Sequence, residues 1–264
     1  TSSLDFIAGP AVWGYEGISK PAGAMQVLSA RISLPDPACV INLSDWLAEE
    51  TARKFVSPEL TGEEVGPRYF NVSMAEWRRV VRRMVRCGLA AGLPANSCPP
   101  GLSGGAFAVA KDPKQDRLIC DRRPQNSQEK SVGRVLLPFC PRLRRLILQR
   151  SYALGVHIID TRNCFYLYQV DPARWHTQIL GPRIPASWLH SVFDESLDSL
   201  PAHCIDPWWD ADLQHGSGGP EPPDDYRQLA ITGIMMGDTN AVTVLEQAHR
   251  RQLINANVLS PESL

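Results

Sequence analysis

The stretch of sequence that decides the fold is F-A-V-A-K-D-P-K-Q-D-R-L-I-C-D-R-R-P-Q-N, residues 107–126. An apolar run leads into a polar turn that contains Pro113, and a second apolar run, R-L-I-C, follows the turn. Two such runs separated by a short turn predict a β-hairpin in which Lys111 and Arg117 flank one loop. Phosphate oxygens accept charge-assisted hydrogen bonds from Lys and Arg, so this loop is a candidate phosphate site. Taken alone, the same pattern is also typical of a solvated basic turn.

A second informative block is V-H-I-I-D-T-R-N-C-F-Y, residues 156–166. Its apolar and β-branched start predicts a buried strand that ends at Asp160. A carboxylate in this position is a candidate ligand for Mg²⁺, which prefers hard oxygen ligands. The alternative role of a single Asp after a strand is to cap the next helix. Phe165 is either part of a binding site or part of the core.

The two blocks together resemble the fingers and the first catalytic strand of a reverse transcriptase. In that family the hairpin reads apolar strand, Lys, short turn, Arg, apolar strand, Asp, then Arg and Asn. The residues at these places are Lys111, Arg117, Asp121, Arg123 and Asn126. The next family block is a strand that ends in Asp, with an aromatic residue shortly after it, as in Asp160 and Phe165.

The resemblance implies a role for each of these residues. Lys111 and Arg117 would bind the triphosphate of an incoming nucleotide, and Phe165 would lie near its sugar and exclude a 2′-hydroxyl. Asp160, together with the backbone carbonyl of Thr161, would hold Mg²⁺ for nucleotidyl transfer by two metal ions. Nucleic-acid contacts are expected for the remaining members of the first block, Asp121, Arg123 and Asn126.

A weaker match is M-M-G-D-T-N-A-V-T-V-L-E-Q, residues 235–247, in the place of the Gly-containing block that supports primer and nucleotide. It implies a substrate-binding role for Gly237. The pair Met236-Gly237 is similar to the divergent retroelement polymerases of eukaryotic microbes. The family's catalytic Tyr-x-Asp-Asp block is not present in the 264 residues. We therefore expect a segment of a larger polyprotein, or a truncated copy, that is inactive as an isolated chain.

The charge distribution supports a polyanion-binding half. The overall charge is −1, but residues 67–150 hold 17 Lys and Arg against 5 Asp and Glu. Residues 183–228 hold 2 Arg against 9 acids. A basic half of this kind has the charge of a nucleic-acid-binding surface.

The densest basic segment predicts a helix. Ser73 and Glu76 form a capping box, and Gly88 is placed to end the helix. An apolar face is predicted for Trp77, Val80, Val81, Met84 and Val85. Five guanidinium groups are predicted to face solvent and to contact a phosphate backbone, those of Arg78, Arg79, Arg82, Arg83 and Arg86. A solvated face without a partner is the alternative.

Other features narrow the class of protein. With 44% hydrophobic and 21% charged residues, the chain can bury a core and is not disordered by composition. The seven cysteines contain no C-x2-C pair, which favours reduced thiols over a disulfide framework. No signal peptide or apolar run of membrane-spanning length is visible, so we expect an intracellular protein without a membrane partner.

We expect an α+β fold that consists of polymerase fingers and a partial palm, with an antiparallel sheet packed against helices. Residues 1–66 are a lead-in of unknown role, with a small helix at residues 43–53 capped by Ser44. Residues 67–150 are fingers-like, and residues 151–264 form a partial palm with an acidic, loop-rich insertion at 183–228. A strand followed by Gly237 and a helix is expected within residues 226–253.

The function that follows is that of a fragment of an RNA-directed DNA polymerase that uses Mg²⁺, a deoxynucleoside triphosphate and a template-primer. The alternative is a noncatalytic, decayed or co-opted fragment that binds nucleic acid or serves as a structural subunit of a larger assembly. An unrelated α/β enzyme with a matching hairpin is a third possibility.

Overall fold

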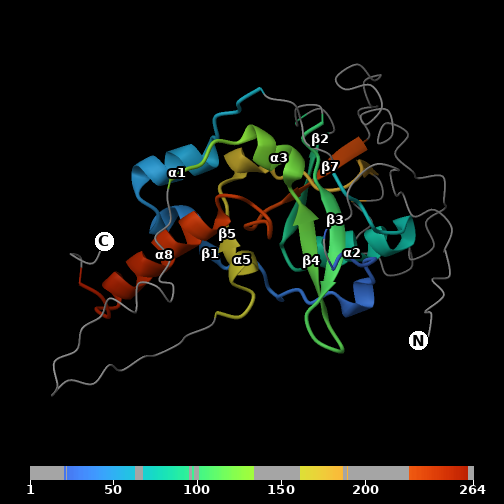
Figure 1. The fold of residues 1–264 in the computed structure, drawn as a ribbon, viewed down its shortest axis with the longest axis horizontal. Coiled ribbons are helices and arrows are strands. Elements are labelled where there is room, and N and C mark those ends of the chain that lie inside the picture. Colours follow the sequence, from blue (N-terminus) through green and yellow to red (C-terminus); the bar gives the residue numbers. More distant parts are fainter. Residues whose placement is uncertain are drawn as a thin grey trace.

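The structure of the protein, a computed structural model, describes residues 21, 23–62, 68–94, 97, 101–133, 161–186, 189 and 226–260. The described part is α+β, as expected, with helices and mostly antiparallel strands (Figure 1). Asp160 and the strand predicted to precede it lie outside the described residues. The same holds for most of the acidic stretch, 183–228.

The predicted hairpin is confirmed. Strand β3 (Gly105–Ala110) pairs antiparallel with β4 (Asp116–Asp121), and Val109 lies opposite Arg117. The Asp112 carboxylate accepts hydrogen bonds from the backbone N–H groups of Lys114 and Gln115, both at 2.8 Å. This side-chain cap closes the turn, because an Asp can satisfy backbone donors that a tight loop leaves unpaired.

The basic helix is confirmed as α2 (Met74–Arg86). Ser73 Oγ accepts a hydrogen bond from the backbone N–H of Glu76, and Gly88 follows the helix with a φ of +83°. Leu89 N and Gly88 N bond back to the carbonyls of Met84 and Val85. These two bonds satisfy carbonyls that a helix end otherwise leaves free, and a left-handed Gly makes them possible.

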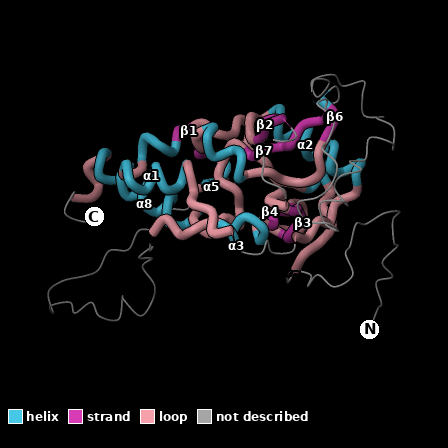
Figure 2. Tube along the Cα trace, turned by 90° about the horizontal axis from the view of Figure 1, so that it is seen from above, coloured by secondary structure: helices cyan, strands magenta, loops and turns pink. Residues whose placement is uncertain are grey.

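Two sheets pack around one core. Strands β2 (Ala90–Pro94), β7 (Tyr226–Ile231) and β6 (Ile184–Pro185) form an antiparallel sheet in the order β2-β7-β6. Figure 2 shows this sheet and the β3–β4 hairpin on opposite sides of the molecule. Buried side chains from α2, both sheets and the lead-in fill the space between them, including Trp77, Met84, Ala108, Leu118, Leu229, Val27 and Ile32.

The acidic stretch begins and ends within the same sheet. Ile184 in β6 lies opposite Arg227 in β7. The strand at its C-terminal end, β7, was expected from residue 226, whereas the short strand β6 at its N-terminal end was not.

A second cluster forms the other end of the molecule. Helices α1 (Glu49–Val56) and α8 (Ala241–Asn255) lie there together (Figures 1 and 2), near the short parallel pair of β1 (Ile41–Asn42) and β5 (Tyr168–Gln169). Its buried side chains include Leu43, Phe55, Val170, Val244 and Ala248. Strand β7, the Gly237 loop and α8 confirm the order predicted for residues 226–253.

The prediction of one small helix at residues 43–53 is wrong. The chain forms a 3₁₀ helix, η2 (Leu43–Trp46), and then α1, with extended backbone at Leu47 and Ala48 between them. The cap of η2 is Asn42, whose side chain accepts a hydrogen bond from Ser44 N, rather than Ser44 itself. The break places Leu47 in the second cluster at 4% exposure, and this burial outweighs a continuous helix.

Candidate functional site

A cavity of about 730 Å³ opens beside the tip of the hairpin. One wall is the turn between β3 and β4, with Lys111, Asp112, Gln115 and Arg117. The other wall is residues 161–166, and Met236 and Ser33 complete the lining. Three sequence blocks that are far apart in the chain therefore meet at one cavity.

The two cations of the hairpin are available for a ligand. Lys111 is half-buried and Arg117 is exposed, and neither side chain forms a hydrogen bond or ion pair with another described residue. The neighbouring acids are engaged elsewhere. Asp116 is held by Arg31, with Nε and Nη2 at 2.7 and 3.0 Å from its two oxygens. Asp112 lines the cavity, but its carboxylate caps the turn, and the backbone bonds from Lys114 and Gln115 lower its pKa.

The opposite wall is a turn followed by the short helix α5 (Cys164–Leu167). Thr161 and Arg162 are exposed, and Cys164 N donates to the carbonyl of Thr161 at 3.3 Å. Asn163 adopts left-handed backbone with a φ of +55°. Asn is one of the few non-glycine residues that tolerates this conformation.

A buried hydrogen bond ties the two walls together. The hydroxyl of Tyr166 donates to the carbonyl of Leu118 in β4 at 3.1 Å. Burial raises the pKa of Tyr166 far above its usual value, so the hydroxyl stays protonated. Because Leu118 follows Arg117 and Tyr166 follows Phe165, this bond sets the separation of Arg117 and Phe165 across the cavity.

Phe165 lies at the cavity and also packs against both hydrophobic clusters. Its carbonyl accepts a hydrogen bond from Ile234 N at 3.2 Å. The predicted substrate contact and the alternative of core packing are therefore compatible with each other. The ring is partly exposed at the cavity and partly held by the core.

The Gly237 loop lies directly after Met236. Gly237 has a φ of +108°, and a Cβ there would be 2.7 Å from the carbonyl oxygen of Cys120 in β4. Asn126 Nδ2 donates to the Gly237 carbonyl at 2.8 Å, and Asn126 Oδ1 accepts from Thr239 N at 3.2 Å. Asn126 therefore holds this loop against the end of the hairpin. Its predicted contact with nucleic acid stays a prediction, as does the substrate contact of Gly237.

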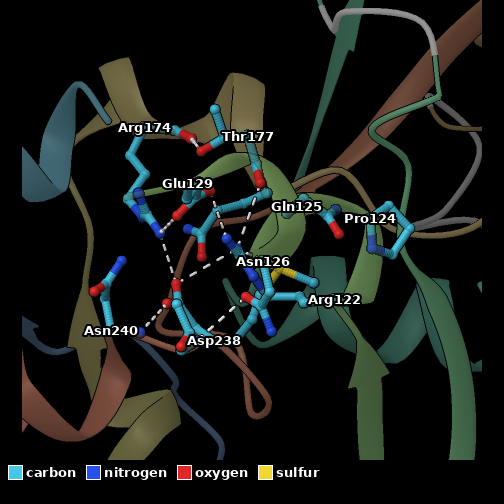
Figure 3. A network of polar contacts seen from close by, with 12 residues as sticks. Arg122, Pro124, Gln125, Asn126, Glu129, Arg174, Thr177, Asp238 and Asn240 are labelled. Carbon is cyan, nitrogen blue, oxygen red and sulfur yellow. Dashed lines mark hydrogen bonds and ion pairs between the residues drawn. The ribbon is translucent and has the colours of Figure 1, made fainter. Parts of the chain in front are cut away.

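A buried network of ion pairs holds the same loop through Asp238, the residue that follows Gly237 (Figure 3). Arg122, Glu129, Arg174 and Asp238 each have fully buried side chains. Glu129 bonds to Arg122 at 2.6 Å and to Arg174 at 2.8 Å, and Asp238 lies 2.6 Å from Arg174 and 3.5 Å from Arg122. Two cations and two anions balance, which offsets part of the cost of removing these charges from water.

The ionic network lowers the pKa of Asp238, one of its two carboxylic acids. Burial alone would raise the pKa of Asp238, but the charges of Arg122 and Arg174 outweigh it and hold the pKa below its usual value. The Arg174 guanidinium also lies 3.9 Å from the centre of the Phe55 ring in α1. The network therefore joins the hairpin end, the Gly237 loop and the lead-in.

Asp121 and Arg123, two further residues of the first sequence block, form an ion pair with each other. Arg123 Nη2 lies 2.7 Å from Asp121 Oδ2, and the same carboxylate accepts the backbone N–H of Tyr69. Asp121 is buried, and Arg123 is partly exposed. The structure thus gives Asp121 a structural partner, and the predicted nucleic-acid contacts of both residues remain predictions.

The basic helix presents fewer guanidinium groups than expected. Arg82 is buried at 8% exposure, so the prediction that all five face solvent is wrong for this residue. Arg82 follows Val81 directly on the part of α2 that packs into the first cluster, and the folded chain covers the helix there. Arg83 donates to the carbonyls of Ser29 and Ile32 in the lead-in, and Arg79 pairs with Glu76. Arg78, half-buried, and Arg79, exposed, lie nearer the surface. That the helix binds nucleic acid stays a prediction.

The predicted metal ligands are divided between described and undescribed residues. Thr161 lies at the cavity, whereas Asp160 lies outside the described residues. Within the described ranges, no group of three or more His, Cys, Asp or Glu side chains is arranged to hold a metal ion. The Mg²⁺ site stays a prediction.

Sequence analysis assigned no role to several residues that line the cavity, among them Ser33, Gln115 and Arg162. A signal existed for Arg162, which is a basic residue in the turn that follows the predicted Asp160 strand. No local signal existed for Ser33, because only the folded chain brings the lead-in to the hairpin: Ile32 bridges to Asp116.

Comparisons of the chain with protein-family models, with curated proteins and with solved structures gave no match. None of the helices in the described ranges is both long and apolar enough to cross a lipid bilayer.

Proposed function

We propose that the chain is a fingers and partial-palm segment of an RNA-directed DNA polymerase and that it binds a deoxynucleoside triphosphate in the cavity beside the hairpin. The observation that carries the proposal is the convergence of Lys111, Arg117 and Phe165 on one cavity. These residues were selected from sequence blocks that are separated by a long stretch of chain. Their meeting is what a nucleotide site built from those blocks requires.

The chemistry of the cavity fits this ligand. Lys111 supplies a point charge and Arg117 a planar fork, and both are free to bond to phosphate oxygens. Phe165 supplies an apolar edge where a sugar without a 2′-hydroxyl packs at no polar cost. Under the proposal, Asp160 and the carbonyl of Thr161 would hold Mg²⁺, which would further neutralise phosphate charge. Because the 264 residues contain no Tyr-x-Asp-Asp block, binding is the activity assigned to them.

The test is equilibrium binding of dTTP to the purified chain at low ionic strength, with Mg²⁺ and with EDTA. Lys111→Ala and Arg117→Ala should each weaken binding at least about tenfold, the weight of one charge-assisted hydrogen bond. The matched control is Lys114→Ala. Lys114 is an exposed cation on the same turn that does not line the cavity, so its loss should change affinity little.

Sugar selection gives a second measurement. Phe165→Ala should reduce the preference for dTTP over the ribonucleotide form by admitting a 2′-hydroxyl. The absence of dTTP binding, or binding that Lys111→Ala and Arg117→Ala leave unchanged, would refute the proposal. A chain that binds duplex nucleic acid but no triphosphate would instead favour the noncatalytic alternative.

A further inference from the structure

Arg162 occupies the wall of the cavity that faces the hairpin. It lies in the turn of residues 161–164, where Cys164 N bonds to Thr161 O and Asn163 takes left-handed backbone. The side chain is exposed and lines the same cavity as Lys111 and Arg117. The cavity is therefore bordered by cations on two opposing walls.

The positive charge of Arg162 is not neutralised by a partner in the described part of the chain. Its side chain has no hydrogen bond or ion pair there, in contrast to most described arginines. Arg31 forms an ion pair with Asp116, Arg123 forms one with Asp121, and Arg83 donates hydrogen bonds to two backbone carbonyls. An unpaired guanidinium at a cavity is a ready donor for an anion, since its planar fork matches two phosphate oxygens.

The charge balance of the cavity calls for an anion with several charges. Among its described lining residues, Lys111, Arg117 and Arg162 carry positive charge and Asp112 carries negative charge. The Asp112 carboxylate is directed to the backbone of its own turn. An anion that carries several charges gains attraction from each of the three cations, and so it gains more than a singly charged ion does.

The separation of the two walls is set by the core. The Tyr166–Leu118 hydrogen bond and the Phe165–Ile234 backbone bond hold the second wall in place. A ligand must span from the hairpin to Arg162 to use all three cations. A longer phosphate chain does so better than a shorter one.

We propose that Arg162 is a third phosphate-binding residue of this cavity and that it makes the site selective for a nucleoside triphosphate over the diphosphate. This inference rests on the proposed function and names a specificity residue for it. Lys111 and Arg117 bind phosphates from the hairpin side, and Arg162 binds the phosphate that only the triphosphate presents to the opposite wall.

The experiment measures the affinities of dTTP, dTDP and dTMP for the parent chain and for Arg162→Ala in one buffer. The variant should lose at least about tenfold in dTTP affinity and much less in dTDP affinity. Arg162→Lys should recover part of the dTTP affinity, because it restores the charge without the fork. The unfolding temperature of each variant in the absence of ligand should match the parent, since the side chain is exposed and makes no described contact.

The matched control is Arg53→Ala. Arg53 is an exposed arginine on α1 that does not line the cavity, so its removal changes net charge equally without touching the ligand. An unchanged ratio of dTTP to dTDP affinity in Arg162→Ala would overturn the inference. If Lys111→Ala and Arg117→Ala still weaken binding in that case, the proposed function stands. If the parent chain binds no dTTP, the proposed function and the role of Arg162 are both refuted.

Discussion

At the scale of single residues, the partner of an arginine decides what the arginine does. Arg122 and Arg174 are buried and neutralised by Glu129 and Asp238, so they serve the fold. Arg117 lies only five positions before Arg122, yet it is exposed at the cavity and unpaired among the described residues. Residue type alone does not separate these roles, because the difference lies in the carboxylates that surround each side chain.

Gly237 provides a test at this scale. Gly237→Ala should destabilise the protein by about 1–3 kcal/mol or more, the cost of a left-handed backbone for a non-glycine residue. The added Cβ would also lie 2.7 Å from the carbonyl oxygen of Cys120. Because Met236 at the cavity is the adjacent residue, dTTP affinity should fall as well. Urea unfolding and dTTP titration measure the two effects.

The control for this change is Gly133→Ala. Gly133 is exposed, its backbone is not left-handed, and the nearest atom to an added Cβ is Thr243 Cγ2 at 3.9 Å. Equal stability of the two alanine variants would contradict the assigned strain at Gly237.

At the scale of elements, the cavity depends on how the hairpin and α5 are joined. The hairpin is local in sequence, but α5 reaches it through Tyr166, which crosses the core to the carbonyl of Leu118. The lead-in adds a second brace, since Arg31 pairs with Asp116 and Ile32 bridges to the same residue. The lead-in of unassigned role thus has a structural part in fixing the base of the turn that carries Lys111 and Arg117.

Tyr166→Phe tests the joint between these elements. Removal of the hydroxyl should lower the free energy of unfolding by about 0.5–1.5 kcal/mol, the net value of one hydrogen bond. It should also weaken dTTP binding, because one of the two hydrogen bonds that hold the second cavity wall in place is lost. Tyr168→Phe is the matched control, because its hydroxyl bonds to Gln252 away from the cavity. That variant should lose stability without losing affinity, and equal affinity losses in both variants would count against the joint.

At the scale of the whole molecule, the three predicted segments share one interior. The first cluster includes Val27 from the lead-in, Trp77 and Leu118 from residues 67–150, and Leu229 from residues 151–264. The ionic network joins residues 67–150, which supply Arg122 and Glu129, to residues 151–264, which supply Arg174 and Asp238. Arg174 also donates a hydrogen bond to the carbonyl of Phe55 in the lead-in. A change at one point of the network is therefore felt across segments.

Asp238→Asn tests the network through its pH dependence. At neutral pH it should destabilise the protein by about 3–5 kcal/mol, because it leaves two buried guanidinium groups with one carboxylate. The pKa of Asp238 lies below its ordinary value in the folded state. The stabilisation by this group is thus complete above its unfolded pKa of about 3.9 and is lost as pH falls through the lower folded pKa. The difference in stability between parent and variant should narrow below about pH 4.

Urea unfolding at several pH values measures this difference. The control is Glu59→Gln, which removes an exposed ion pair with Lys130 and should change stability little at any pH. A gap between parent and Asp238→Asn that stays constant down to pH 3 would show that the carboxylate charge is not what the network uses.

The sequence by itself determined the parts of the protein that depend on neighbours along the chain. The hairpin with Lys111 and Arg117, the capped helix α2 and the helix after Gly237 all follow from period, turn residues and caps, which act over a few positions. Only the tertiary structure decided which charged residues are free. It buried Arg82, paired Arg123 with Asp121, and brought Arg162 and Ser33 to the hairpin. The physical reason is that burial and ion pairing depend on groups distant in sequence, whose positions are set by the packing of the common core.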